Sequence, residues 1–339
     1  MQRVWFNKTF SSIAAAIRLI READITGDYY IVCSNTKPSP AFPAAHESAL
    51  EPAGLKGEAY LEWCLHFCHE NRIGIFVPGK EASLVSAARG KFAAQGTRVL
   101  CAASQEVLHL LHDKARFYQT VDLELAQPAA FRVVENVEQF DAAYRELRES
   151  HAKLCIKPSV SVYGLGFSVI DEKRGAAQLL LEGVPYHIGL DDLRRGFAAM
   201  DGFRTMLVME YLDGPEYSVD CIGDNGRLVC AIPRKKALVA GQGQTIDMRD
   251  DILEGARQLT AAYGLNGVFN IQFRESQNGL RLLEINPRMS GGIAMACLAG
   301  PNLPYLALVG FDRGGFDGLQ IPEIRAGMRV AELACATEL

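Results

Sequence analysis

Hydrophobic and polar positions in the first third of the chain follow two alternating periods. Short apolar runs, typical of buried strands, alternate with segments whose apolar residues recur every three or four positions, which indicates helices. The predicted strands are residues 4–6, 29–33, 73–77 and 99–102, and the predicted helices are residues 11–22, 58–71 and 81–95. This alternation predicts a small parallel sheet with helices on its faces.

Beyond a predicted helix at 104–118, the pattern changes to a small α+β section and then to a run of strands. The α+β section has predicted strands 131–135, 154–157 and 167–170 and a helix at 137–150. Strands 205–211, 216–223 and 228–233 are expected to form a meander, because Gly, Asp and Asn at 223–226 are typical of a hairpin turn. A helix at 252–263 precedes strands 267–274 and 280–285. The predicted fold class is therefore mixed α/β and α+β.

Composition adds bounds to this picture. A length of 339 residues favours two or three domains, and 49% hydrophobic with 22% charged residues excludes a disordered or fibrous chain. The formal charge of −5 gives no basic footprint for nucleic acid. Nine cysteines indicate reduced thiols, so we expect a cytoplasmic protein. Residues 289–311 carry no charge, but their glycines and prolines predict a buried helix and a turn rather than a membrane span.

The strongest chemical signal lies on the last two strands. Glu284 and Asn286 are two positions apart, so their side chains leave the same face of a strand, and Gln272 on the neighbouring strand can point to that face. One carboxylate and two amide oxygens are ligands that Mg²⁺ accepts while it keeps water and substrate phosphates. Arg288 follows at once, and its planar guanidinium suits a phosphate. These four residues predict a metal–phosphate site.

Two further segments have weaker signals of their own. Lys157 ends an apolar strand before a loop of small residues that includes Ser159, Gly164 and Gly166, an arrangement that suits phosphates but also fits an ordinary turn. The segment 209–216 runs from a strand through a Gly-Pro turn between Glu210 and Glu216, where backbone groups suit an adenine edge and a carboxylate suits ribose hydroxyls. Taken alone, that segment is an acidic hairpin.

Taken in order, these pieces resemble the ATP-grasp superfamily. They are K-P-S…Y-G-L-G-F, M-E-Y-L-D-G-P-E-Y-S-V-D, N-I-Q-F and E-I-N-P-R-M-S-G-G. The last two most resemble the branch of carbamoyl-phosphate synthase and biotin carboxylase, and the set also resembles the ATP-grasp proteins associated with tellurium-resistance gene clusters. The resemblance covers about residues 113–300. It implies an N-terminal α/β domain at 1–112, a small lid domain at 113–208 and a central antiparallel sheet domain at 209–339.

The resemblance also implies a role for each matching residue around ATP and Mg²⁺ or Mn²⁺. Lys114 and Lys157 match the two phosphate-binding lysines, and Ser159, Gly164 and Gly166 lie in the loop over the phosphates. Glu210, Tyr211 and Leu212 match the hinge beside adenine, and Glu216 matches the ribose acid. Gln272, Glu284 and Asn286 match the metal ligands, and Arg288 matches the arginine at the transferred phosphoryl group. Arg234 is a second candidate for that arginine, or else a solvated basic turn.

The implied activity is that of a carboxylate–amine ligase that activates a small carboxylate as an acyl phosphate and joins it to an amine or similar nucleophile. Two alternatives stay open: a carboxylating or phosphorylating enzyme of the carbamoyl-phosphate synthase type, and a non-catalytic ATP-binding regulatory module. The expected partners are small molecules, without nucleic acid or membrane, and a homodimer is compatible with the sequence. The chain departs from the biotin carboxylases in its glycine-poor loop at 159–166.

Three other patterns favour ordinary structure over chemistry. Cys64, His66, Cys68 and His69 resemble a zinc motif, but only the cysteines share a helix face, so core packing is the preferred interpretation. Thr9, Ser11 and Ser12 are expected to cap a helix. Residues 78–81 lie past a strand end, where α/β sheets bind ligands; a turn is preferred, with Glu81 as the candidate substrate contact.

Overall fold

The computed structural model describes residues 1–7, 12–125, 127–161, 164–239, 241–277 and 279–333. Its contacts divide the chain into two units. Unit 1 comprises Met1–His109, Pro215–Phe273 and Glu284–Leu339, and unit 2 comprises Leu110–Gly214 and Arg274–Leu283. The division into three domains at 112 and 208 is finer than this, and its boundaries stay a prediction.

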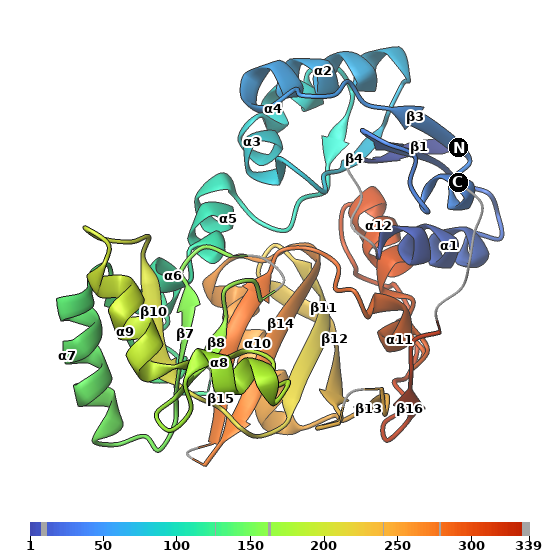
Figure 1. Cartoon of the computed structure of the whole chain (residues 1–339). Coiled ribbons are helices and arrows are strands. Elements are labelled where there is room, and N and C mark those ends of the chain that lie inside the picture. The colour runs from blue at the N-terminus through green and yellow to red at the C-terminus, as the bar shows by residue number, and fades with distance from the viewer. Residues whose placement is uncertain (8–11, 126, 162–163, 240, 278, 334–339) are drawn as a thin grey trace. The chain divides into compact units, whose positions relative to one another are not determined.

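The N-terminal part of unit 1 is the predicted parallel α/β layer (Figure 1). Its strands lie in the order β3-β2-β1-β4-β5, and all neighbours are parallel. The strands are β1 (Gln2–Phe6), β2 (Tyr29–Asn35), β3 (Glu47–Leu50), β4 (Ile75–Val77) and β5 (Arg98–Val99). The helices are α1 (Ile13–Ala23), η1 (Phe42–Ala44), α2 (Gly57–Glu70), α3 (Ala82–Ala87) and α4 (Arg89–Ala93). The alternating pattern therefore predicted this layer correctly, but it missed the short β3.

A second sheet in unit 1 has the order β15-β14-β11-β12-β13-β16. Its strands are β11 (Glu216–Asp224), β12 (Arg227–Lys236), β13 (Gln244–Ile246), β14 (Gly267–Ser276), β15 (Gly279–Asn286) and β16 (Arg329–Val330). Its helices are α10 (Asp250–Ala262), α11 (Ile293–Cys297) and α12 (Leu303–Arg313). The tip of the β14–β15 hairpin, Arg274–Leu283, belongs to unit 2.

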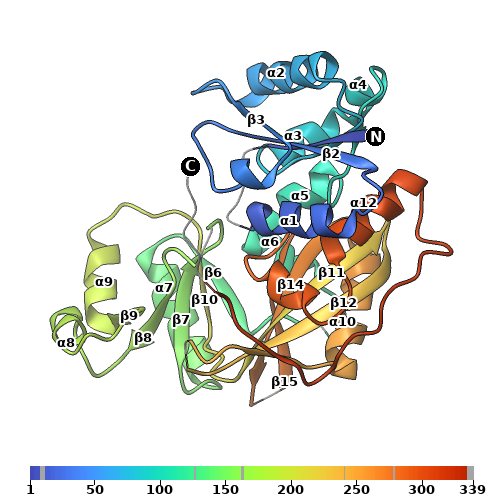
Figure 2. The same cartoon turned by 90° about the vertical axis from the view of Figure 1, so that its right-hand side faces the viewer.

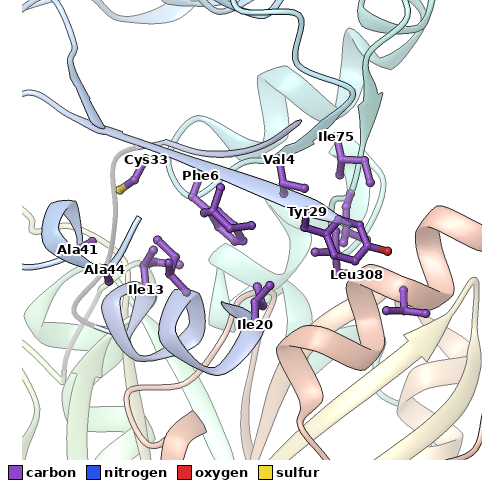
Figure 3. Close-up of a cluster of buried hydrophobic side chains, with 14 residues drawn as sticks. Val4, Phe6, Ile13, Ile20, Tyr29, Cys33, Ala41, Ala44, Ile75 and Leu308 are labelled. Atoms are coloured by element: carbon purple, nitrogen blue, oxygen red, sulfur yellow. The ribbon is translucent and has the colours of Figure 1, made fainter. Parts of the chain in front are cut away.

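One core of unit 1 joins the N-terminal layer to the C-terminal helix α12. Figure 3 shows Leu308 of α12 in the same cluster as Val4, Phe6 and Tyr29 of the parallel sheet. Helices α1 and α12 lie side by side in both views (Figures 1 and 2). The uncharged stretch is thus buried as predicted, but it forms two helices, because Pro301 and Asn302 interrupt it and the Asn302 side chain accepts a hydrogen bond from the Tyr305 amide (3.2 Å). No helix in the described ranges is long and apolar enough to span a membrane.

Unit 2 is built around a mixed five-stranded sheet of order β6-β10-β7-β8-β9. Its strands are β6 (Phe131–Val134), β7 (Leu154–Pro158), β8 (Ser168–Asp171), β9 (His187–Gly189) and β10 (Met206–Glu210). The helices are α6 (Lys114–Thr120), α7 (Val137–Arg148), α8 (Ala176–Leu181) and α9 (Leu190–Ala198), and α5 (Gln105–His112) precedes them. Helices α7 and α9 meet through Phe140 and Phe197, whose rings pack edge to face with centroids 5.4 Å apart.

The structure corrects three sequence expectations. Strand β10 does not continue into a meander with β11 and β12: it pairs antiparallel with β6 and β7, because the Gly214-Pro215 turn ends it. The helix predicted at 104–118 is broken at Asp113, whose carboxylate accepts hydrogen bonds from the amides of Ala115 (3.1 Å) and Arg116 (3.3 Å) and so begins a new helix. The helix predicted at 81–95 is likewise two helices, α3 and α4.

Candidate functional site

The predicted metal and phosphate residues form a connected row at the end of β15. The Asn286 amide donates to Glu284 Oε1 over 2.9 Å, and Arg288 Nη2 lies 3.5 Å from Asn286 Oδ1. The Arg288 amide bonds to the Asn286 carbonyl (2.7 Å), and its Nη1 donates to the Met289 carbonyl (3.0 Å). All three side chains are half-buried. The strand alternation that suggested a shared face therefore produced adjacent, bonded side chains.

Gln272 lies on β14, the neighbour of β15, and is half-buried between fully buried Ile271 and Phe273. Among the described residues, no group of three or more His, Cys, Asp or Glu side chains could hold a metal ion. The predicted set is of another kind, with one carboxylate and two amide oxygens. Hard oxygen donors of this type, with few protein charges, fit Mg²⁺ that also binds phosphate. The donor chemistry therefore fits the predicted ion.

Arg234 is enclosed in unit 1. Its side chain is 2% exposed, and its Nε donates to Asp220 Oδ2 over 2.8 Å, while Asp220 itself is 0% exposed. Its Nη2 donates to Ser218 Oγ (3.1 Å) and Ser290 Oγ (3.0 Å), and its Nη1 donates to Gln244 Oε1. The interpretation as a solvated basic turn is therefore wrong. A direct role at the phosphoryl group stays a prediction.

The hydrogen bonds of Arg234, called the Arg234 network below, hold the loop that follows Arg288. Ser290, two residues after Arg288, bonds to the Arg234 guanidinium, and Gly292 packs directly on it. A Cβ at Gly292 would lie 2.7 Å from Arg234 Cζ, so a side chain there would displace the hydrogen-bonded guanidinium. Asn270 of β14 completes the network, because its side-chain amide donates to Ser218 Oγ (3.0 Å) and Asp220 Oδ1 (3.1 Å).

Glu216, the predicted ribose acid, begins β11 and forms an ion pair with Lys236 at the end of β12. The Glu216 side chain is 23% exposed. The carboxylate is therefore already held in one direction by a lysine, which leaves further acceptor positions on a group that has about four lone-pair sites.

In unit 2, both predicted phosphate lysines are held by neighbouring oxygens. Lys157 Nζ donates to Tyr118 Oη over 2.9 Å, and the Tyr118 hydroxyl donates in turn to the Leu283 carbonyl. Lys114 is 8% exposed, and its Nζ donates to the Ser161 carbonyl (3.2 Å). Burial raises the pKa of the neighbouring Cys155 thiol to about 12, so that side chain is neutral.

Ser159 joins the loop to the start of α6. Its hydroxyl donates to the Asp113 carboxylate and accepts from the Ala115 amide (3.0 Å). Gly166 has φ +83°, and a Cβ there would lie 2.8 Å from Pro158 Cγ, which explains why glycine is needed. Gly164 also has positive φ, at +69°, with open space around it. Residues 162–163 of this predicted loop lie outside the described residues.

The predicted adenine hinge is fixed by backbone hydrogen bonds within unit 2. The Glu210 amide donates to the Ala130 carbonyl (2.9 Å) and the Tyr211 amide to the Lys153 carbonyl (3.0 Å). The Glu210 side chain is 9% exposed, and its Oε1 lies 3.7 Å from His151 Nδ1. Leu212 is 5% exposed.

Sequence reasoning missed Tyr118, Asp220, Ser218 and Ser290. The only usable signal was the strand alternation Glu216, Ser218, Asp220, which puts three polar residues on one face of β11.

In the discounted zinc motif, Cys64 and Cys68 are buried in α2 and the two histidines are exposed, as the core-packing interpretation predicted. Ser12 precedes α1 without a side-chain cap, contrary to expectation, and Thr9 and Ser11 lie outside the described residues.

Comparison with known proteins identifies the fold. The family model described as "ATP-grasp in the biosynthetic pathway with Ter operon" matches residues 202–336. The arginine-specific carbamoyl phosphate synthase large chain of Bacillus subtilis is 23% identical over 205 residues, which cover 56% of this chain. The crystal structure of an N5-carboxyaminoimidazole ribonucleotide synthetase with ADP aligns with a TM-score of 0.67, 14% identity and coverage of 97% of this chain and 80% of that one. The chain has the fold of ATP-grasp proteins, and its residues 202–336 match an ATP-grasp family model.

The chain is also similar in fold to an L-amino acid ligase from Bacillus licheniformis, with a TM-score of 0.61, 12% identity and coverage of 91% of this chain and 73% of that one. The match to the carbamoyl phosphate synthase spans only 18% of that relative's length. Neighbours of this fold were solved with ADP and with MgADP.

Proposed function

We propose that this ATP-grasp protein is a carboxylate–amine ligase that forms an acyl phosphate from a small carboxylate. The observation that carries the proposal is the bonded row Glu284, Asn286 and Arg288 at the end of β15. A protein that only binds a nucleotide needs fewer groups aligned for phosphoryl transfer. The name of the L-amino acid ligase neighbour agrees with this reaction class.

Each residue has a proposed task. Lys114 and Lys157 bind phosphate oxygens, Ser159, Gly164 and Gly166 belong to the loop that covers them, and Glu210, Tyr211, Leu212 and Glu216 bind the nucleoside. Gln272, Glu284 and Asn286 are the proposed ligands of Mg²⁺, which neutralises phosphate charge when bound. Arg288 contributes a cation at the phosphoryl group, where preorganised charge lowers the barrier most.

The proposed reaction needs no nucleophilic side chain. An oxygen of the substrate carboxylate attacks the γ-phosphorus of ATP, an O–P bond forms, the bond to the β-phosphate oxygen breaks, and ADP leaves with the electron pair. The nitrogen of an amine then attacks the acyl carbon, phosphate leaves, and the amine loses a proton to solvent. Arg288 acts by charge and position in the first step.

A second candidate is carboxylation, with bicarbonate as the activated acid. The carbamoyl phosphate synthase relative favours it, although the match covers 18% of that protein. The non-catalytic regulatory module is the third.

The test incubates the chain with ATP, Mg²⁺, a pool of carboxylates and hydroxylamine. The ligase predicts ADP formation that depends on an added acid, together with the corresponding hydroxamate. ADP formed only with bicarbonate would favour carboxylation, and ATP binding without ADP from any acid would favour the regulatory module.

A further inference from the structure

A cavity of about 60 Å³ lies wholly within unit 1, at the carboxyl ends of the parallel strands. Phe6 of β1, Val77 of β4 and Leu100 after β5 form its wall on the sheet side, and Leu308 of α12 closes it from the C-terminal part of the unit. In α/β sheets, ligands bind at this end of the strands. Arg288 also lines the cavity, so one side of it is formed by the proposed phosphoryl-transfer residue.

The lining of the cavity is mainly apolar, with polar side chains from Asn7, Ser12 and Arg288. Among the described residues that line the cavity, Arg288 is the one charged side chain. Burial raises the pKa of the Cys101 thiol, so this lining group is neutral. A second negative charge on a ligand would lose water here and meet no second cation among the described lining residues, which is unfavourable.

The polar part of the wall is held rigidly from behind. Asn7 is 1% exposed; its Oδ1 accepts from the Gly79 amide (2.7 Å) and its Nδ2 donates to Tyr60 Oη (2.8 Å). The Tyr60 hydroxyl donates in turn to the buried Glu51 carboxylate over 3.0 Å. Through these hydrogen bonds the Asn7 side chain connects the end of β1 to the turn at residues 78–79. Glu81, the residue predicted to contact substrate, does not line the cavity.

We propose that this cavity binds the hydrocarbon end of a short monocarboxylate whose carboxylate faces Arg288. The inference rests on the proposed ligase function and names its substrate class. About 60 Å³ corresponds to roughly four or five water-sized positions. A side chain of a few carbon atoms fits this space, whereas a sugar, a nucleotide or a second carboxylate does not.

The experiment changes the cavity at Val77, which is half-buried. Hydroxamate formation and ADP release are measured with acetate, propionate, butyrate, isovalerate and succinate. For the unaltered chain we expect one of the short monocarboxylates to exceed succinate at least tenfold in kcat/KM. Val77→Ala should move the optimum to a longer acid, and Val77→Phe should abolish the use of butyrate while acetate survives. Val229→Ala, a half-buried valine of β12 outside the cavity, should leave the ranking unchanged.

Saturation-transfer NMR with butyrate, without ATP, separates this inference from the proposed function. Butyrate binding that Val77→Phe removes, with no ADP from any acid, would support the cavity assignment and reject the ligase. Turnover of acids with a ranking that both Val77 variants leave unchanged would reject the cavity assignment and keep the ligase. A preference for succinate, or neither binding nor turnover of any monocarboxylate, would also reject the cavity assignment. Melting curves of both variants verify that they fold.

Discussion

Two arginines of unit 1 differ sharply in their surroundings, although the sequence made both candidates for the same phosphoryl group. Arg234 lies among Asp220, Ser218, Ser290 and Gln244 and is 2% exposed. Arg288 is half-buried, bonds to groups of its own chain segment and lines a cavity. Four hydrogen bonds direct the Arg234 guanidinium into the protein, so its charge is matched by Asp220.

The difference shows how a buried ion pair can serve a neighbouring site. Arg234 touches the loop after Arg288 through Ser290 and Gly292, so its effect on phosphate would pass through that loop. We therefore propose that Arg288 is catalytic and that Arg234 is a positioning residue. The following changes test that division.

The largest effect is expected at the proposed metal ligands. Glu284→Ala should abolish turnover, because it removes the one carboxylate among the three proposed ligands, while the melting temperature stays close to that of the parent. ADP release with the best acid measures the loss. Full activity in this variant would refute the metal assignment.

Arg288→Ala should lower kcat about 10³-fold or more, the range found for arginines that stabilise phosphoryl transfer, with little change in stability. Arg313→Ala, an exposed arginine at the end of α12, is the matched control and should retain full activity. If Arg288→Ala kept its activity, Arg288 would not be the catalytic arginine, and Arg234 would be the next candidate.

Arg234→Met should reduce the free energy of unfolding by about 3–5 kcal/mol, because it leaves the Asp220 charge buried and unpaired. Arg227→Met on the same strand removes an ion pair between the exposed Arg227 and Asp224 and should cost far less. Urea denaturation measures both. The double variant Arg234→Met, Asp220→Leu should recover much of the loss, and equal losses for Arg234→Met and Arg227→Met would contradict the buried-pair interpretation.

The smallest effect is expected in thiol chemistry around the Arg234 network. Burial raises the pKa values of Cys230 and Cys297 to about 12. Both thiols are therefore protonated at pH 8. Because iodoacetamide reacts with the thiolate, alkylation should be slow in the parent and faster in Arg234→Met. Since the folded pKa exceeds the unfolded one, these thiols favour folding below about pH 8.5 and lose that contribution as the pH rises toward 12. Mass spectrometry of alkylated peptides measures the rates; equal rates in both proteins would mean that the network does not protect this core.

The sequence predicted the Glu284 row because two-residue alternation on one strand is a local property. It could not predict the partners of Arg234. At the hairpin turn, Asp224 pairs with Arg227. If this register continued along β11 and β12, Arg234 would lie opposite Tyr217, on the face of the sheet away from Ser218 and Asp220. A bulge between Ile222 and Gly223 shifts the pairing by one residue, so Ser218 lies opposite Arg234 instead. Such a shift moves the following side chains to the opposite face of the strand, and the local sequence pattern does not predict it.

The fold was predictable to a similar depth. The parallel layer follows from alternating periods over short stretches, as in β1, α1 and β2. Strand β10 was assigned to the wrong sheet because its pairing with β6, more than 70 residues earlier, depends on distant contacts rather than on its own pattern. Tyr118 was missed for a related reason, since its contacts with Lys157 and Leu283 are formed only when three distant segments fold together.

The position of Leu308 in the N-terminal core has a consequence for how the molecule is made. Tyr29 and Leu308 pack in one cluster but are 279 positions apart in the chain. At roughly 5–20 residues per second, a ribosome adds Leu308 about 14–56 s after Tyr29. Until then the apolar side of the parallel sheet that α12 covers stays open to other chains and to chaperones. A fragment cut after His109 would keep that exposed face permanently, so this sheet is a poor choice for expression on its own.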